Sequence, residues 1–304
     1  MVDYRPLQEE LRALAREKNA LIIAHNYQRP EVQDAADFTG DSLELSRIAA
    51  STGNEIILFC GVHFMAETAH ILSPEKKVLI AEMKAGCPMA DMITAGDVRK
   101  LKRYHPEALV VAYVNTSAAV KAETDICCTS ANAAKVVANI PVDREIVFIP
   151  DRNLALHVEK KTGRQLIKWE GFCPTHEYIT ADTIIKTKKE HPEALVVAHP
   201  ECLPEVRELA DAIESTSGMI RFAKESPARE FIIATEMGLN YRLGKENPGK
   251  SFYSPTKKAL CPNMKMTTLP KAIETLRTGR YEIRLDEDVR RRALKAVEAM
   301  VSYI

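Results

Sequence analysis

Short continuous apolar runs recur along the chain and alternate with segments of helical periodicity. Residues 20–24, 108–112 and 194–198 are runs of Ala, Leu, Ile and Val. Such runs are typical of strands that are buried on both faces of a parallel sheet. They end at His25, Tyr113 and His199, which are 88 and 86 residues apart. The pattern therefore predicts three copies of one α/β unit.

A hydroxyl residue stands 17 positions after each of these strand ends. Ser42, Ser130 and Thr216 each precede a helical segment, so each of them can cap a helix. A hydroxyl at a helix N-terminus can also join backbone N–H groups in binding a carboxylate or a phosphate. A second apolar strand, a further helix and a third strand follow in each copy.

Three Cys-Pro pairs follow the same period. Cys87, Cys173 and Cys261 are separated by 86 and 88 residues, and a threonine that would cap the next helix stands seven positions after each of them. The carboxyl ends of parallel strands form the functional edge of an open sheet. Three units around a pseudo-threefold axis would therefore bring three thiolates to one central cavity. Because the three cysteines are in register, we expect them to bind a metal.

The kind of metal site is left open by the residues themselves. Three thiolates could bind zinc, completed by a histidine such as His176, or an iron–sulfur cluster. A [4Fe–4S] cluster held by three cysteines keeps one iron open as a Lewis acid, which suits dehydration chemistry. The other cysteines have no counterparts in the other repeats and are expected to pack in the core, although the predicted cavity could reach two of them, Cys128 and Cys202. These four cysteines are Cys60, Cys127, Cys128 and Cys202.

Polar, titratable residues directly follow the buried strands. The three segments are His25-Asn26-Tyr27, Tyr113-Val114-Asn115 and His199-Pro200-Glu201. Their convergence predicts an active site in which Glu201 is the general base, because only the third repeat has a carboxylate at this place. Tyr27, Tyr113 and His199 would donate protons or polarise carbonyls. His176, three residues after Cys173, is expected to face the same cavity, whereas His63 and His70 are expected to be structural or at the surface.

The repeat predicts an α/β fold of three pseudo-threefold-related α/β/α sandwich domains with small parallel sheets. We assign residues 1–105 to the first repeat with its N-terminal helix. Residues 106–191 form the second repeat. Residues 192–304 form the third, which ends in a helix over residues 286–303.

Composition narrows the function classes. The chain of 304 residues has 42 basic and 42 acidic residues, so it lacks the positive field expected of a nucleic-acid-binding protein. No signal-like segment or apolar stretch of membrane-spanning length is evident, which argues against secretion and against a membrane span. Seven cysteines without dense spacing fit a reducing compartment, so we expect a cytoplasmic protein.

The chain resembles the quinolinate synthase family, the A proteins of de novo NAD biosynthesis, over essentially its whole length. The resemblance rests on Ala24-His25-Asn26-Tyr27, Gly40-Asp41-Ser42, Gly86-Cys87-Pro88-Met89-Ala90, Tyr113-Val114-Asn115, Thr129-Ser130-Ala131-Asn132, Gly171-Phe172-Cys173-Pro174-Thr175-His176, His199-Pro200-Glu201, Ser215-Thr216-Ser217 and Cys261-Pro262-Asn263-Met264. It implies three domains around a [4Fe–4S] cluster held by Cys87, Cys173 and Cys261. It also implies condensation of iminosuccinate with dihydroxyacetone phosphate to quinolinate, phosphate and water.

The resemblance also implies substrate-binding residues and a functional partner. The residues that would bind substrate are His25, Ser42, Tyr113, Asn115, Ser130, His199, Glu201 and Thr216. The labile imine would come from an aspartate-oxidising enzyme. Some longer family members have a Cys-x-x-Cys-x-x-Cys group near the third ligand; here Cys261 stands alone, so no redox switch of that kind is expected. The alternatives to an enzyme are an iron–sulfur redox sensor without a substrate and a structural Cys₃His zinc protein.

Overall fold

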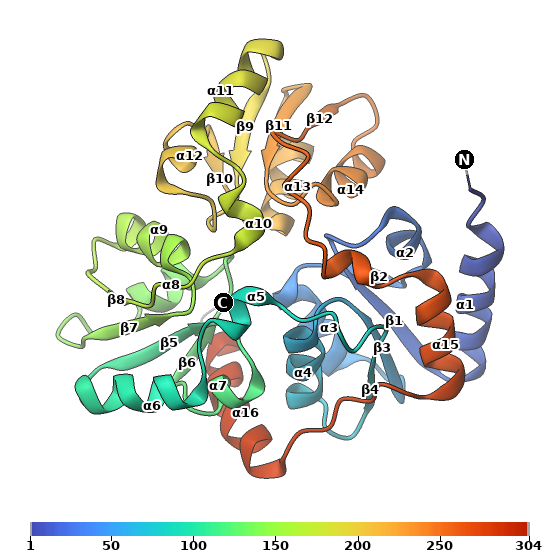
Figure 1. Ribbon diagram of the computed structural model, residues 1–304, viewed down its shortest axis with the longest axis horizontal. Coiled ribbons are helices and arrows are strands. Elements are labelled where there is room, and N and C mark those ends of the chain that lie inside the picture. Colours follow the sequence, from blue (N-terminus) through green and yellow to red (C-terminus); the bar gives the residue numbers. More distant parts are fainter. Residues whose placement is uncertain (1, 303–304) are drawn as a thin grey trace.

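Each predicted repeat forms a four-stranded parallel sheet, and the three sheets surround one centre (Figure 1). The computed structural model describes residues 2–302. The predicted α/β class with three small parallel sheets is confirmed. We call the sheets β1–β4, β5–β8 and β9–β12, with the helices packed on them, the first, second and third units.

The elements follow one another in the same order in each unit. The first comprises α1 (Arg5–Glu17), β1 (Ala20–His25), α2 (Pro30–Ala35), β2 (Phe38–Gly40), α3 (Ser42–Ser51), β3 (Ile56–Cys60), α4 (His63–Leu72), β4 (Lys77–Ile80) and α5 (Pro88–Asp91). Next come α6 (Ala95–Tyr104), β5 (Leu109–Tyr113), α7 (Ala118–Lys121), β6 (Ile126–Cys128), α8 (Ala133–Ala138), β7 (Ile146–Ile149), α9 (Arg152–Thr162), β8 (Ile167–Lys168) and α10 (Pro174–Glu177). The remainder comprises α11 (Ala181–Glu190), β9 (Leu195–Ala198), α12 (Pro204–Glu208), β10 (Ala212–Ile213), α13 (Thr216–Glu225), β11 (Glu230–Ala234), α14 (Leu239–Glu246), β12 (Ser251–Tyr253), the 3₁₀ turn η1 (Met264–Met266), α15 (Leu269–Thr278) and α16 (Glu287–Ser302).

The strand order is the same in all three sheets, with the first strand of each unit in second place: β2-β1-β3-β4, β6-β5-β7-β8 and β10-β9-β11-β12. A repeated aspartate helps to set this order. The carboxylates of Asp37, Asp125 and Asp211 each accept the N–H of a residue 15 positions earlier on the central strand, at 2.8 Å. Each aspartate thus satisfies a strand N–H just before the short edge strand begins.

Two of the three threonines that were predicted to cap helices do so. The Thr94 hydroxyl accepts from Asp97 N–H at the start of α6, and Thr180 accepts from Thr183 N–H at the start of α11. Thr268 stands at the corresponding position of α15, but its side chain makes no capping bond, so this part of the prediction is wrong.

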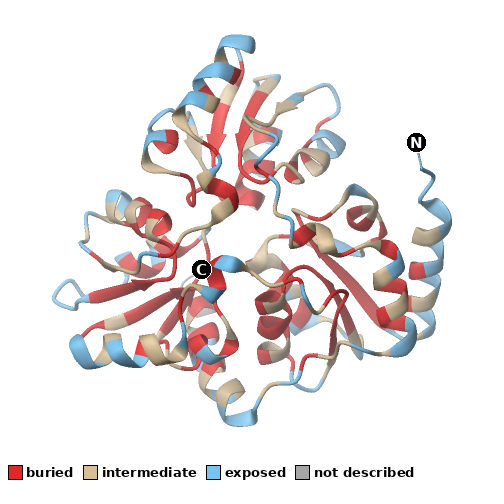
Figure 2. Cartoon of the chain, viewed as in Figure 1, coloured by how far each residue is buried: buried red, intermediate tan, exposed pale blue. Residues whose placement is uncertain are grey.

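The hydrophobic core is divided unevenly among the units. The two central strands of each sheet are largely buried in all three units (Figure 2). One large apolar cluster joins the first and second units and includes Phe59, Tyr113 and Phe148. The third unit has two clusters of its own, to which the other units add only the partly buried Tyr27. The two clusters of the third unit are thus separate from the large one, which Met264 of η1 also joins.

The last two helices leave the third unit. The predicted third repeat, residues 192–304, includes both of them, yet α15 packs on α1, β3 and β4, and α16 packs on β6, α7 and α4. Between them, Tyr281 and Ile283 exchange backbone hydrogen bonds with β4. Figure 1 shows these red segments beside the blue and green ones. Helix α16 runs to Ser302; Tyr303, which was predicted to end it, lies outside the described residues.

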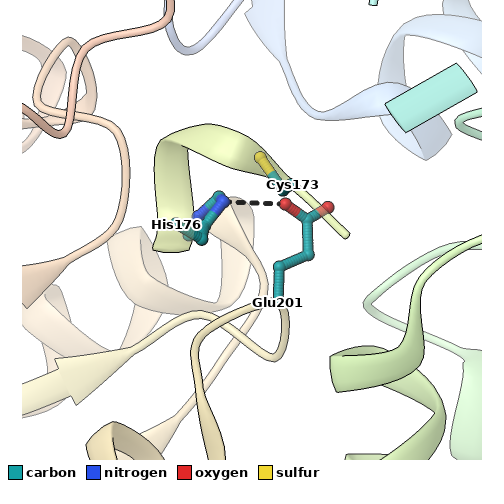
Figure 3. A group of neighbouring side chains, drawn as sticks. All are labelled: Cys173, His176 and Glu201. Atoms are coloured by element: carbon teal, nitrogen blue, oxygen red, sulfur yellow. Dashed lines mark ion pairs between the residues drawn. The ribbon is translucent and has the colours of Figure 1, made fainter. Parts of the chain in front are cut away.

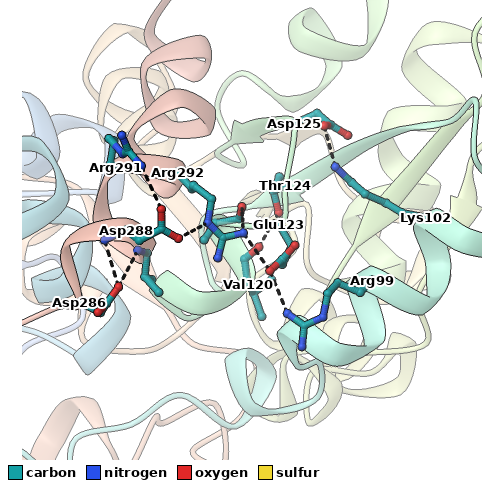
Figure 4. A network of polar contacts seen from close by, with 12 residues as sticks. Arg99, Lys102, Val120, Glu123, Thr124, Asp125, Asp286, Asp288, Arg291 and Arg292 are labelled. Carbon is teal, nitrogen blue, oxygen red and sulfur yellow. Dashed lines mark hydrogen bonds and ion pairs between the residues drawn. The ribbon is translucent and has the colours of Figure 1, made fainter.

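An ion-pair network fastens α16 to the second unit (Figure 4). The Arg292 guanidinium lies 3.1 Å from the Glu123 carboxylate and 3.0 Å from that of Asp288. Arg99 of α6 binds the same Glu123 oxygen at 2.8 Å. Glu123 therefore joins α16 to α6, while the apolar side chains of Val297 and Met300 are fully buried. No helix within residues 2–302 is both long and apolar enough to cross a membrane.

Candidate active site

A cavity lies where the carboxyl ends of the strands of all three units meet. Its wall contains every residue that was predicted to bind substrate, to catalyse or to bind metal: His25, Tyr27, Ser42, Cys87, Tyr113, Asn115, Ser130, Cys173, His199, Glu201, Thr216 and Cys261. The sequence period thus brings residues that are up to 236 positions apart, from His25 to Cys261, to one place. The cavity wall also includes the predicted His176 and several residues that were not foreseen.

The three cysteines occupy equivalent places at the start of short helical turns. Cys87 and Cys173 directly precede α5 and α10, each of which begins with a proline, and Cys261 precedes η1. Burial raises the pKa of Cys87 to about 12, and the N–H groups of Ala90 and Met89 oppose this rise. The other two thiols have the same combination of burial and nearby N–H groups. All three are free.

Contacts between loops hold the cysteines in place. A Cβ atom on Gly171 would lie 2.3 Å from the Pro150 carbonyl oxygen, so only glycine allows this close approach two residues before Cys173. The side-chain amide of Asn263 donates to Gly86 O at 2.8 Å, which links the Cys261 loop to the Cys87 loop. Glu236 accepts from Cys261 N–H at 3.1 Å and pairs with Lys265 at 2.9 Å.

The two strand-end histidines have the same tautomer. Nδ1 of His25 accepts from Tyr27 N–H at 3.1 Å, and Nδ1 of His199 accepts from Glu201 N–H at 3.3 Å. Each ring must therefore carry its proton on Nε2. Burial lowers the pKa of both histidines to about 3. Both rings are thus neutral hydrogen-bond donors at physiological pH.

Glu201 is the centre of the polar cluster in the cavity. It is 4% exposed, and its Oε1 accepts from the Tyr113 hydroxyl at 2.6 Å. Its Oε2 lies 2.8 Å from His176 Nδ1 (Figure 3). The same oxygen lies 3.8 Å from His199 Nδ1. The short His176 contact does not have hydrogen-bond geometry, so we treat it as electrostatic. Burial raises the pKa of Glu201, but His176 and the Tyr113 hydroxyl lower it more, and the carboxylate is ionised at neutral pH.

A second chain of contacts connects His176 with Tyr27. The Thr235 hydroxyl lies 2.8 Å from His176 Nε2 and 2.6 Å from the Tyr27 hydroxyl. Burial, followed by the charge of Glu201, raises the pKa of Tyr27 and Tyr113 well above the ordinary range, so both phenols keep their protons. The rings of His176 and His199 stack at 4.9 Å, which aligns the two imidazoles.

The three hydroxyls do not cap their helices, which corrects the expectation for that role. Asp41 accepts from the N–H groups of Leu43 and Glu44, and Ser215 accepts from Gly218 N–H. Ser42 and Thr216 are instead the first residues of α3 and α13. In the second unit, the Asn132 side chain accepts from Thr129 N–H, and α8 begins only at Ala133. Because neighbouring residues make these bonds, Ser42 and Ser130 keep their hydroxyls for the cavity.

Within the described residues, one group of three donor atoms lies close enough together to hold a metal ion. The ligand atoms of Cys173, His176 and Glu201 lie within 4.8 Å of one another (Figure 3). The set overlaps the predicted three-cysteine site through Cys173. The cavity therefore offers thiolate, imidazole and carboxylate donors side by side.

The four other cysteines, and His63 and His70, lie where they were expected. Cys60, Cys127, Cys128 and Cys202 are fully buried, and none lines the cavity. His63 and His70 belong to α4 and also lie outside the cavity wall. The approach of Cys128 and Cys202 to the cavity, which the sequence left open, does not occur.

The sequence interpretation missed the polar residues that follow the second long strand of a unit. Thr235 and Glu236 come directly after β11, and Asp151 occupies the place of Glu236 after β7. All three are fully buried. Burial raises the pKa of Asp151, and its Oδ2 has no partner. The same sequence signal that identified the first strand ends, a polar residue after an apolar run, was present at these places too.

The chain is similar to known proteins over almost its whole length. The family model for the quinolinate synthetase A protein matches residues 9–302. A quinolinate synthase of Thermodesulfovibrio yellowstonii is 55% identical over 97% of this chain and 98% of its own length. Similar proteins with the same name occur in Desulforudis audaxviator, at 52% identity over 97% of this chain and 98% of that protein, and in Methanoregula boonei, at 51% over 99% and 100%.

Proposed function

Because the chain belongs to the quinolinate synthetase A protein family, we propose that it is a quinolinate synthase acting in NAD biosynthesis. It condenses iminosuccinate with dihydroxyacetone phosphate and releases quinolinate, phosphate and water. The observation that carries the proposal is the convergence of three free thiols and the Glu201 cluster on one buried cavity. We further propose that the protein works in the cytoplasm and receives the imine from an aspartate-oxidising enzyme.

The residues of the cavity fit a [4Fe–4S] cluster. Cys87, Cys173 and Cys261 would hold it, because they are free, line one cavity and stand where backbone N–H groups approach sulfur. Cluster sulfurs and thiolates are stabilised by such N–H groups. When bound through three cysteines, the cluster supplies an open iron that acts as a Lewis acid toward a substrate oxygen. Zinc, the competing assignment, needs its ligand atoms within about 4 Å of one another. Among the described residues only Cys173, His176 and Glu201 bring ligand atoms within 4.8 Å of one another, so the three cysteines with His176 do not form a zinc site.

The chain's own residues suit a small substrate with two carboxylates. The Nε2–H groups of His25 and His199 are donors, and so are the hydroxyls of Ser42, Ser130 and Thr216 at the cavity wall. The buried Oδ1 of Asn115 has no protein partner and can accept a hydrogen bond from a substrate N–H or O–H. Enclosure of these groups strengthens their electrostatic effect and excludes water that would hydrolyse an imine.

Proton transfer centres on Glu201 and the two phenols. Glu201 is ionised and acts as the base, and Tyr113, only 2.6 Å away, holds a proton that it can give to a leaving oxygen. Tyr27, which also lines the cavity, has the same capacity. His199 polarises a carbonyl through its Nε2–H. These roles need several groups with different proton affinities in one place, which the environments of the carboxylate and the phenols provide.

The test is anaerobic purification followed by metal analysis and assay. We expect a brown protein with about four irons per chain, which forms quinolinate from dihydroxyacetone phosphate and freshly generated iminosuccinate. Replacing Cys87, Cys173 or Cys261 by alanine should remove iron and activity together. Cys60→Ala is the matched control, because Cys60 is a buried cysteine outside the cavity, and it should keep both.

Each alternative has its own signature in this experiment. A colourless protein with one zinc would support the structural zinc protein. A stable cluster without quinolinate formation would support the redox sensor. Normal iron content in any of the three cysteine variants would overturn the ligand assignment.

A further inference from the structure

We propose that Thr235 is a positioning residue of this site: its hydroxyl holds the Tyr27 phenol and orients the His176 ring against Glu201. The inference rests on the proposed function, because it assigns a role within that reaction. Nothing in the sequence pattern of the first strands points to Thr235, and its place becomes evident only from the contacts in the folded chain.

The contacts of Thr235 are short and fully enclosed. Its Oγ1 lies 2.6 Å from the Tyr27 hydroxyl and 2.8 Å from His176 Nε2. Thr235 is 0% exposed and His176 is 1% exposed. Water therefore cannot replace the hydroxyl without entering the packed wall between the two side chains. A buried polar atom that loses its partner is costly in such a place.

The proton inventory fixes the direction of the chain. His176 Nδ1 lies 2.8 Å from Glu201 Oε2, and although the pair lacks hydrogen-bond geometry, the negative charge of the carboxylate favours a proton on Nδ1 over a lone pair. Nε2 then accepts, and the hydroxyl that lies beside it is that of Thr235. Having given its one proton to Nε2, Thr235 Oγ1 accepts from Tyr27. The order is Tyr27 to Thr235 to His176, with His176 Nδ1–H facing Glu201.

This arrangement sets His176 apart from the other two histidines of the cavity. His25 and His199 each use Nδ1 to accept a backbone N–H and carry the proton on Nε2. In His176 the assignment is reversed. Thr235 therefore gives this imidazole a tautomer that the strand-end histidines cannot have.

The position also breaks the threefold pattern. Thr235 directly follows β11, and the residues that directly follow β3 and β7 are Gly61 and Pro150. Neither has a hydroxyl. Glu201 likewise has no carboxylate counterpart in the other repeats, so both differences fall in the third unit. Thr235 thus links the third unit to Tyr27 of the first unit.

The experiment compares two substitutions of Thr235. Thr235→Val keeps the shape and removes the hydroxyl, and we expect kcat to fall about 10- to 100-fold, because the loss of one buried hydrogen-bond partner leaves its neighbours unsatisfied. KM and iron content should change little. Thr235→Ser keeps the hydroxyl and should remain within a few-fold of the parent. Thr275→Val is the control, since Thr275 is an equally buried threonine that lies outside the cavity.

Two further measurements separate positioning from packing. If Thr235 acts through His176, the double variant of Thr235→Val and His176→Gln should be little worse than His176→Gln alone. In ¹⁵N-histidine NMR spectra, the His176 Nε2 resonance, assigned by its absence from His176→Gln, should move downfield in Thr235→Val and stay in place in Thr235→Ser.

The outcomes test the role of Thr235 separately from the proposed function. An inactive parent protein with an intact cluster would overturn the function, and the NMR comparison would still test the hydrogen bond. An active parent with unchanged kcat in Thr235→Val would overturn the inference. Equal losses in Thr235→Val and Thr235→Ser, or losses that add fully to those of His176→Gln, would also overturn it.

Discussion

Replacing Glu201 by glutamine should separate the chemistry of the site from its architecture. The amide is nearly the same shape as the carboxylate, and its oxygen can still accept from the Tyr113 hydroxyl that lies 2.6 Å from Oε1. In the variant the amide nitrogen would take the place of Oε2, 2.8 Å from His176 Nδ1, and would favour the His176 tautomer without a proton on Nδ1. The variant loses the negative charge and the capacity to take up a proton. We therefore expect the fold and the iron content to persist and turnover to fall.

The expected sizes of the two effects differ widely. A general base typically contributes ~100- to 10,000-fold to the rate, or about 3–5 kcal/mol of the barrier. Hydrogen bonds to a charged group exceed neutral ones by about 1 kcal/mol, and removing a buried charge offsets part of that loss. The free energy of unfolding should therefore change by no more than about 2 kcal/mol. Loss of turnover far beyond loss of stability is the expected pattern.

The assay is quinolinate formation in the same anaerobic preparation that gives the cluster spectrum and the thermal unfolding curve. Glu67→Gln is the matched control. Glu67 is also a buried glutamate beside a histidine, with His63 Nδ1 at 3.7 Å, and it accepts from Ala118 N–H at 2.9 Å, yet it does not line the cavity. Near-parental turnover of Glu201→Gln with an intact spectrum would refute the reasoning and move the base role to Tyr27 or His199.

Two further predictions concern stability. The pKa of His25 and of His199 is about 3 in the fold and about 6.5 in the unfolded chain, so only the unfolded chain binds these protons as the pH falls below 6.5. The free energy of unfolding therefore falls from pH 6.5 downward, by about 2 kcal/mol per histidine at pH 5. Equal free energies of unfolding at pH 7.5 and pH 5 would contradict this prediction. Arg292→Ala removes the bridge between α16 and Glu123, which should cost about 1 kcal/mol and lower Tm by about 2–4 °C in thermal scans; an unchanged Tm would show that apolar packing alone holds α16.

The sequence could predict the elements that recur in all three units, because three matching segments identify a strand or a helix that one segment alone leaves ambiguous. Runs such as residues 108–112 and 194–198 identified the central strands, and the polar residues at their ends identified the titratable part of the cavity wall around Glu201. The caps were harder to assign, since Asp41 and Ser42 are both good capping residues and only the backbone decides between them. Thr235 was missed because a single hydroxyl after a strand has no period to mark it, and its two partners come from distant parts of the chain.

Helices α15 and α16 are synthesised last but pack on the first and second units, which affects how the chain folds during synthesis. The ribosome releases the first unit early, but the apolar cluster beneath α1 includes Leu269, Ile273 and Leu276 of α15. The large apolar cluster that joins the first and second units likewise lacks Val297 and Met300 until synthesis is almost complete. A nascent chain therefore carries uncovered apolar surface through most of its translation, and its folding to the final state must wait for the last helix. Loss of a short C-terminal piece, as from a premature stop codon, would damage the units that were made first.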